Sequence, residues 1–338
     1  MASNLGLVAA AVLATLLILE AALRLFGLAS PIIYRLDPRF GYEPMPSQSS
    51  FRLGVRVHIN DVGLRDDEDF AALMKGTERI LVIGNSVTYG SSLVSQPELF
   101  TEVLERELRS RRPGVKVLNA GVAGYSVSQM MMRAPRLVEL TAPHHLVLYV
   151  IQNDFRRPPV RYPAEGSPQE PLKRPRSALI TFMQLSLPFL DGRYGIRKLL
   201  PQPLQALWPR GPSPDVPWYD RSRVVEIHIE AVERFLRTVW EPGGHDRSNV
   251  IAFISPTRSD VLENRPMPNA DLVRRFDSLG IQAYDLQSDF HDGIIAAGHD
   301  IAEYYHDDIH YRERGNELAG RAVAKHLIQQ GFAATTVP

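Results

Sequence analysis

Short apolar runs alternate with helical segments along the first half of the chain, and this alternation constrains the fold most. Residues 79–86 (RILVIGNS), 115–121 (VKVLNAG) and 145–154 (HLVLYVIQND) each have the length and composition of a buried strand. Residues 97–111 have apolar side chains at helical spacing with charges between them. A strand, helix, strand, helix, strand order predicts a doubly wound α/β fold with right-handed crossovers.

The same rhythm returns in the second half of the chain. It predicts helices and strands at 223–240, 249–255, 269–279, 281–286 and 313–330. We therefore expect a three-layer α/β/α domain over residues 61–335, with a mostly parallel sheet of about five strands.

The N-terminus differs from the rest of the chain in composition. No charge occurs from Leu5 to Leu19, and the whole apolar stretch of about 23 residues matches one bilayer crossing. Glu20 and Arg24 interrupt it at i,i+4 spacing, so they can pair near a membrane interface. We expect residues 1–30 to be a transmembrane anchor. A cleaved signal peptide is the alternative, although no Lys or Arg precedes the apolar run.

Two further segments lack the α/β rhythm. Residues 31–60 are rich in Pro, Ser and Tyr and then become strand-like, which suggests a linker followed by an edge strand or hairpin. Residues 155–222 contain proline-rich and basic stretches around the apolar run ALITFMQLSLPFL. We interpret 155–222 as an insertion that forms an amphipathic lid or a membrane-contacting hairpin.

Composition excludes several function classes. Lys plus Arg (38) balances Asp plus Glu (38), so no overall charge points to nucleic acid as a partner. Cysteine is absent, which excludes thiolate catalysis and cysteine-ligated metal. No phosphate-binding glycine motif occurs, and the histidines near the C-terminus lack metal-ligand spacing. We expect neither a cofactor nor a metal.

Ser86 is the candidate nucleophile. It stands in a Gly-Asn-Ser turn directly after the strand at 79–86, and open α/β sheets place their chemistry at the carboxyl ends of strands. The alternative interpretation is an ordinary strand-to-helix turn, since Gly, Asn and Ser are common turn residues.

A serine nucleophile needs a base and a group that orients the base. His310 follows Asp307 by three residues in YYHDDIHYRERG, so a turn can bring the carboxylate to the imidazole Nδ1. Taken alone, this acidic segment is better explained as a solvated loop that caps the following helix.

Candidate oxyanion donors lie at the ends of three expected strands. They are the Ser86 N–H, the N–H of a glycine in NAGVAG and the Asn153 side chain. Gly124 is the better choice of glycine and Gly121 the alternative. Each of these residues could instead serve only as a turn or cap.

Together these four blocks resemble the SGNH (GDSL-type) hydrolase superfamily. The matches, in order, are Gly84-Asn85-Ser86 with Thr88 and Gly90, Gly124 in NAGVAGYS, Asn153, and the Asp307-x-x-His310 pair. The preceding HINDVGLRD is similar to a lead-in of membrane-anchored bacterial members.

This sequence departs from the family's pattern at two places. Asn85 stands where the family usually has Asp, which keeps the shape and removes a charge. Ile151 and Gln152 replace glycines that usually precede the third-block Asn, which adds bulk near the oxyanion site.

The resemblance implies a serine ester hydrolase of the carbohydrate esterase, deacetylase or lipase type. Ser86, His310 and Asp307 would form its triad, and Ser86, Gly124 and Asn153 its oxyanion hole. The expected substrate is an acyl ester on a surface glycan or lipid, with the domain on the extracytoplasmic (periplasmic) side of the membrane. An O-acetyltransferase of polysaccharide biosynthesis and a catalytically silent glycan-binding domain are the alternatives.

Overall fold

A five-stranded parallel sheet forms the centre of the molecule, in the strand order β6-β5-β7-β8-β9. The computed structural model describes residues 2–52, 54–74, 78–91, 94–163, 171–184, 223–264 and 269–331. The sheet strands are β5 (Glu78–Gly84), β6 (Val115–Asn119), β7 (His145–Ile151), β8 (Val250–Ser255) and β9 (Gln282–Asp285). The chain moves from β5 to one edge and then back across to β7, and ligands of doubly wound sheets bind at such a reversal.

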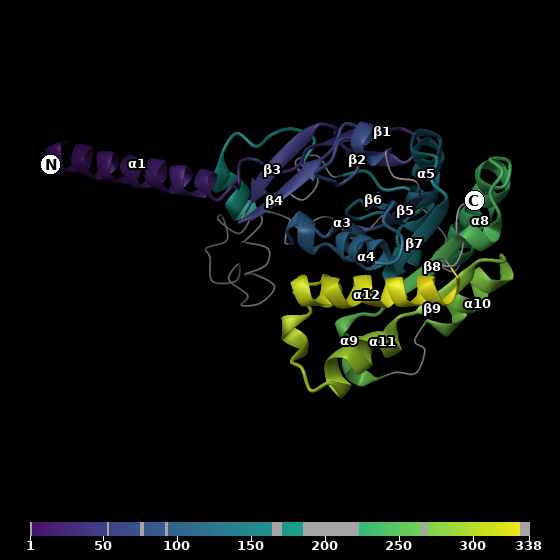
Figure 1. Cartoon of the computed structure of the whole chain (residues 1–338). Helices are drawn as coiled ribbons and strands as arrows, with labels where there is room; N and C mark the ends of the chain where they lie inside the picture. Colours follow the sequence, from purple (N-terminus) through teal and green to yellow (C-terminus); the bar gives the residue numbers. More distant parts are fainter. Residues whose placement is uncertain are drawn as a thin grey trace.

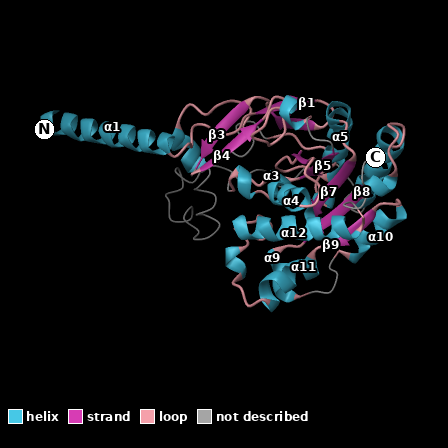
Figure 2. Ribbon diagram, in the orientation of Figure 1, coloured by secondary structure: helices cyan, strands magenta, loops and turns pink. Residues whose placement is uncertain are grey.

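Helices cover both faces of the sheet and complete three layers (Figures 1 and 2). One face packs against α5 (Val127–Thr141), α8 (Val224–Phe235) and α10 (Ala270–Ser278). The other packs against α4 (Phe100–Arg109), α11 (Gln287–His291) and α12 (Glu313–Gln329). The expected three-layer α/β/α fold is therefore confirmed.

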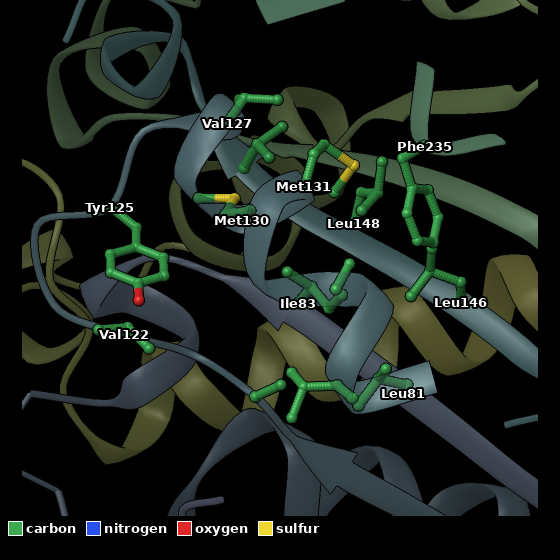
Figure 3. Packing of buried hydrophobic residues seen from close by; sticks show 14 of the residues in the cluster. Leu81, Ile83, Val122, Tyr125, Val127, Met130, Met131, Leu146, Leu148 and Phe235 are labelled. Atoms are coloured by element: carbon green, nitrogen blue, oxygen red, sulfur yellow. The ribbon is translucent and has the colours of Figure 1, made fainter. Parts of the chain in front are cut away.

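The strands supply side chains to both layers in alternation. In β5, Leu81 and Ile83 enter the cluster under α5, whereas Ile80 and Val82 enter the cluster under α4 and α12. This is the period of two that places successive strand side chains on opposite faces. Figure 3 shows Leu81 and Ile83 in the first cluster, where Met130 of α5 also packs.

The stretch expected to be a linker forms two hairpins instead. The first pairs β1 (Tyr34–Asp37) with β2 (Gly41–Pro44), and the second pairs β3 (Gln48–Arg52) with β4 (Val55–Ile59). Both hairpins are separate from the central sheet.

The first hairpin is part of the packed domain because of contacts made far along the chain. The Tyr42 hydroxyl donates to the Ala123 carbonyl at 2.5 Å. Buried Glu43 forms ion pairs with Arg133 and Arg136 of α5. These contacts join residues far apart in the sequence, so the composition of residues 31–60 does not show them.

The N-terminal helix α1 (Ala2–Leu25) extends from the domain (Figure 1). Its segment Gly6–Leu25 is long and apolar enough to cross a membrane, and it is almost entirely exposed. A signal sequence has the same length and apolar character. The expected pair near its end is present, with Arg24 Nε donating to the Glu20 carboxylate at 2.8 Å.

The described residues also include three short helices and a helical segment of the expected insertion. The short helices are α2 (Phe70–Leu73), α3 (Ser86–Tyr89) and α9 (Arg258–Glu263). Of the expected insertion 155–222, residues 155–163 and 171–184 are described, and 178–184 are helical. The remainder of that expectation, at 164–170 and 185–222, lies outside the described residues.

Candidate active site

Ser86 is the first residue of α3, immediately beyond the carboxyl end of β5. The turn is tight: a Cβ on Gly84 would lie 2.0 Å from Thr88 Oγ1, so the chain needs glycine there. Asn85 caps α3 by accepting the Val87 N–H on its side-chain oxygen at 2.7 Å. Ser86 itself retains only 8% exposure.

Ser86, His310 and Asp307 form a continuous chain of hydrogen bonds. Ser86 Oγ lies 2.8 Å from His310 Nε2, across 224 residues of sequence. His310 Nδ1 lies 2.7 Å from Asp307 Oδ2. The sequence-predicted nucleophile, base and orienting carboxylate are therefore brought together, in the relative order that a serine triad requires.

The geometry around Asp307 keeps its carboxylate ionised. Burial opposes ionisation, but hydrogen bonds from the His310 ring and from the backbone N–H groups of His310 and Ile309 outweigh it. The two backbone bonds to Oδ1 are each 2.8 Å long. The bond from the His310 ring and these two backbone bonds together hold the pKa of Asp307 well below its usual range, so the group is an anion.

The neighbouring acid, Asp308, points elsewhere. Its Oδ1 accepts from the Ser259 hydroxyl at 2.8 Å and from the Ser259 N–H at 3.1 Å. Its carbonyl accepts the Arg258 N–H at 2.7 Å. Asp308 therefore fastens the loop carrying the His310 imidazole to the start of α9.

The two candidate glycines have different surroundings. A Cβ on Gly121 would lie 2.3 Å from the Tyr89 backbone nitrogen, so Gly121 allows the loop after β6 to pack on α3. Gly124 has φ of +76°, and a Cβ there would lie 2.4 Å from Arg161 Nη2. The positive φ is what favours glycine at position 124, because the Arg161 guanidinium is the end of a flexible side chain and can move.

Asn153 lies in the turn after β7, exposed at the carboxyl edge of the sheet. The next residue, Asp154, is fully buried and joins this turn to the turn of Ser86. Its Oδ2 accepts from Asn85 Nδ2 at 2.6 Å and from the Ile151 N–H at 3.0 Å. Its Oδ1 pairs with Arg157 Nη1 at 2.7 Å.

The structure thereby accounts for the amide at position 85. Burial raises the pKa of Asp154, while Arg157 and the donated hydrogen bonds act against this rise. An amide at position 85 can donate to this carboxyl in either protonation state, whereas a carboxylate would repel it.

Asn119 and Arg65, to which the sequence interpretation gave no role, also hold the nucleophile turn. Asn119 Nδ2 donates to the Thr88 carbonyl at 2.8 Å, and its oxygen accepts the Gly121 N–H at 3.0 Å. Buried Arg65 donates to the Ser91 and Val94 carbonyls, each at 2.6 Å. Both residues lie in sequence blocks already quoted, NAGVAGYS and HINDVGLRD, which was the only local signal for them.

A separate cavity of about 450 Å³ lies between α5 and α8. Met131, Met132 and Phe235 are among its lining residues, and neither Ser86 nor His310 is. Within the described ranges, no group of three His, Cys, Asp or Glu residues is placed to hold a metal ion.

Comparisons with known proteins found resemblance at the level of solved structures. No family model and no curated protein matches the sequence. An α/β hydrolase from the metagenome of Lake Arreo, Spain, aligns with a TM-score of 0.43 and 15% identity, over 78% of this chain and 99% of that one. An acetylxylan esterase of Geobacillus stearothermophilus, crystallised as a catalytic mutant, aligns at 0.44 and 14%, over 76% and 95%.

A two-domain esterase active on acetylated mannans aligns with a TM-score of 0.47 and 16% identity. The alignment covers 79% of this chain and 53% of the esterase, so this chain spans about half of that protein. The chain is a three-layer α/β/α protein in which Ser86, His310 and Asp307 form a hydrogen-bonded series at the carboxyl edge of the sheet.

Proposed function

We propose that the chain is a serine ester hydrolase. The observation that carries the proposal is the pair of short contacts, 2.8 Å from Ser86 Oγ to His310 Nε2 and 2.7 Å from His310 Nδ1 to Asp307. A serine hydroxyl is a weak nucleophile until a base accepts its proton, and this arrangement supplies that base.

In the acylation step, Ser86 Oγ attacks the ester carbonyl carbon while His310 Nε2 takes the hydroxyl proton. Asp307 holds the ring with Nδ1 protonated and stabilises the imidazolium that forms. The tetrahedral intermediate then collapses, the alcohol leaves with the proton from Nε2, and the acyl group remains on Ser86.

In the deacylation step, water replaces the alcohol and the same groups act in reverse. His310 Nε2 takes a proton from water, the hydroxide attacks the acyl carbonyl, and Ser86 Oγ leaves with the proton. An acceptor hydroxyl in place of this water would make the chain a transferase.

The negative charge on the carbonyl oxygen needs donors in both steps. We assign this role to the Ser86 and Gly124 N–H groups and the Asn153 side chain. Support comes from their placement at the ends of β5, β6 and β7, and from the Asn85–Asp154 bond, which ties two of these turns together. Such donors are each worth about a hundred- to a thousandfold in rate.

The finer proposal concerns substrate and location. We propose that the ester belongs to an acylated glycan or lipid outside the cytoplasm, reached by a domain that α1 anchors to the membrane. The apolar span Gly6–Leu25 supports the anchor. The esterase that acts on acetylated mannans is one example of a protein with glycan esters as substrates.

The direct test is covalent labelling of the full chain with a fluorophosphonate, followed by an acetyl-ester assay. Wild type and a Ser110→Ala control, altered at an exposed serine at the end of α4, should both label and hydrolyse. Ser86→Ala should not label, and His310→Ala should lose most turnover, because the two residues act as a unit. Folded wild-type protein that does not label would overturn the proposal.

A further inference from the structure

The end of α1 is fastened to a short segment far along the chain. The Glu20 carboxylate accepts the Ser177 hydroxyl at 2.8 Å and the N–H groups of Ala178 and Leu179, each at 2.9 Å. Arg24 Nη2 donates to the Arg176 carbonyl at 2.7 Å. Glu20 thus caps the helical turn at 178–184, and the position of this turn relative to α1 is fixed.

That helical turn exposes apolar side chains next to the apolar span. Ile180, Phe182 and Met183 are 58%, 43% and 46% exposed, and Leu25 and Phe26 at the end of α1 are 80% and 58% exposed. We call these five residues the apolar collar. Single exposed apolar residues are ordinary, but the collar continues a helix that is itself long enough to cross a bilayer.

Charge next to the collar also fits a membrane surface. Three exposed basic residues precede the helical turn, at Lys173, Arg174 and Arg176. Basic side chains beside an apolar helical face are typical of segments that lie in the headgroup region of anionic bilayers. The occupant that fits the collar is therefore the bilayer that holds α1.

The candidate active site faces the same way as the collar. In Figure 1, α3 and the beginning of α12 lie on the side of the sheet toward α1, so the carboxyl edge of the strands faces the side from which α1 extends. The π-helical turn η4 (Leu236–Trp240), which precedes β8, lies at the opposite edge.

We propose that the substrate ester is carried by a membrane-embedded amphiphile and reaches Ser86 from the bilayer surface on which the collar rests. This inference rests on the proposed ester hydrolysis. The collar fixes the distance of the domain from the headgroups, and α1 prevents the site from turning away. Esters at the membrane surface are then favoured over esters in solution.

Placement is tested without reference to activity. The chain has no cysteine, so Met183→Cys and Arg237→Cys each give one attachment point for an environment-sensitive fluorophore. Full-length protein is placed in nanodiscs of equal parts phosphatidylcholine and phosphatidylglycerol. The label at 183 should shift to shorter wavelength and the label at 237 should not. Identical, water-like emission from both would overturn the inference.

Orientation is tested with energy transfer to a dye on the lipid headgroups. A donor on Gln152→Cys, at the carboxyl edge next to Asn153, should transfer strongly, whereas a donor on Arg237→Cys should transfer weakly. Equal transfer, or stronger transfer from 237, would overturn the inference.

Substrate class is tested with one acyl group in two settings, as soluble p-nitrophenyl acetate and as acetylated diacylglycerol in the nanodisc. Ile180→Glu/Phe182→Glu should lose about tenfold or more on the lipid ester and keep the soluble rate, which also shows that it is folded. Arg237→Glu is the matched control and should keep both rates.

Equal lipid rates for wild type and the double variant would overturn the inference. Absence of hydrolysis of either ester by wild type would overturn the proposed function, while the two placement tests would still judge the collar.

Discussion

Asn85 and Asp154 are joined by a hydrogen bond of 2.6 Å between the amide of one and the carboxyl of the other. The bond spans 69 residues and links the turn after β5 to the turn after β7. In the sequence, position 85 is known only as an Asn where the family usually has Asp, which keeps the shape and removes a charge. Because Asn85 contacts buried Asp154, we expect a change from Asn to Asp at position 85 to have a large effect on kcat.

Asn85→Asp should make kcat fall as pH rises. Two facing carboxyls can remain in contact only while they share a proton, so the pKa of the pair is raised and the contact is lost as pH rises. Compared with wild type at the same pH, we expect the variant to have a similar kcat at about pH 5 and a kcat about ten- to a hundredfold lower at about pH 8. The measurement is a kcat profile against pH for wild type and variant.

The exchange of the two groups gives the decisive control. Asn85→Asp/Asp154→Asn restores an amide facing a carboxylate, although the Ile151 N–H then loses its acceptor at position 154. The double variant should recover much of the activity that Asn85→Asp loses at high pH. No recovery would show that Asp154 has a role beyond this contact.

Asp307→Asn should reduce kcat far more than Asp308→Asn. The first change removes the anion that accepts from His310 Nδ1, and about three to four orders of magnitude are expected from loss of the correct tautomer. The second leaves a side-chain oxygen that can still accept from Ser259. Steady-state kinetics on a soluble ester measure both, and greater sensitivity at Asp308 would contradict the triad.

Arg65→Lys should destabilise the protein despite keeping the charge. Burial lowers the pKa of Arg65 to about 10, and its guanidinium bridges several carbonyls that one ammonium cannot reach together. We expect a loss of about 2–4 kcal/mol in the free energy of unfolding. Urea denaturation measures it, and Arg56→Lys on the exposed side of β4 should be neutral.

Asp66 should make stability fall as pH rises. Burial raises the pKa of Asp66 from 3.8 to about 7, so the folded protein binds a proton that the unfolded chain has already lost. The contribution of Asp66 to the free energy of unfolding should decline between about pH 4 and 7, by roughly 4 kcal/mol for a difference of three pKa units. Asp66→Asn should remove this contribution from the pH profile of stability. Asp67→Asn, at the exposed neighbouring position, should leave it unchanged.

The sheet and its helices could be predicted because their signals are local. The run at 145–154 is apolar enough to read as a buried strand without knowledge of its neighbours, and β7 occupies most of it. The β1–β2 hairpin could not be predicted in this way. Its burial depends on contacts such as Tyr42 with Ala123, which lies 81 residues away.

The same difference between local signals and long-range contacts applies to the candidate site. Ser86, Asp307 and His310 stand in short motifs, so their types and spacing were visible in the sequence. The role of Arg65 was not, because its partners Ser91 and Val94 accept through backbone carbonyls, which leave no mark on residue identity. The reason for an amide at position 85 was not visible either, because its partner Asp154 lies 69 residues away in the sequence.

The separation of Ser86 from His310 by 224 residues also has a consequence for biosynthesis. Ser86 leaves the ribosome long before His310 does. The loop that carries His310 is held by the contact of Asp308 with α9 and precedes α12, where the Asn316 side chain accepts the Phe100 N–H at 3.0 Å. In a nascent chain, Ser86 therefore lacks its hydrogen-bond partner until the segment from α9 to α12 has folded.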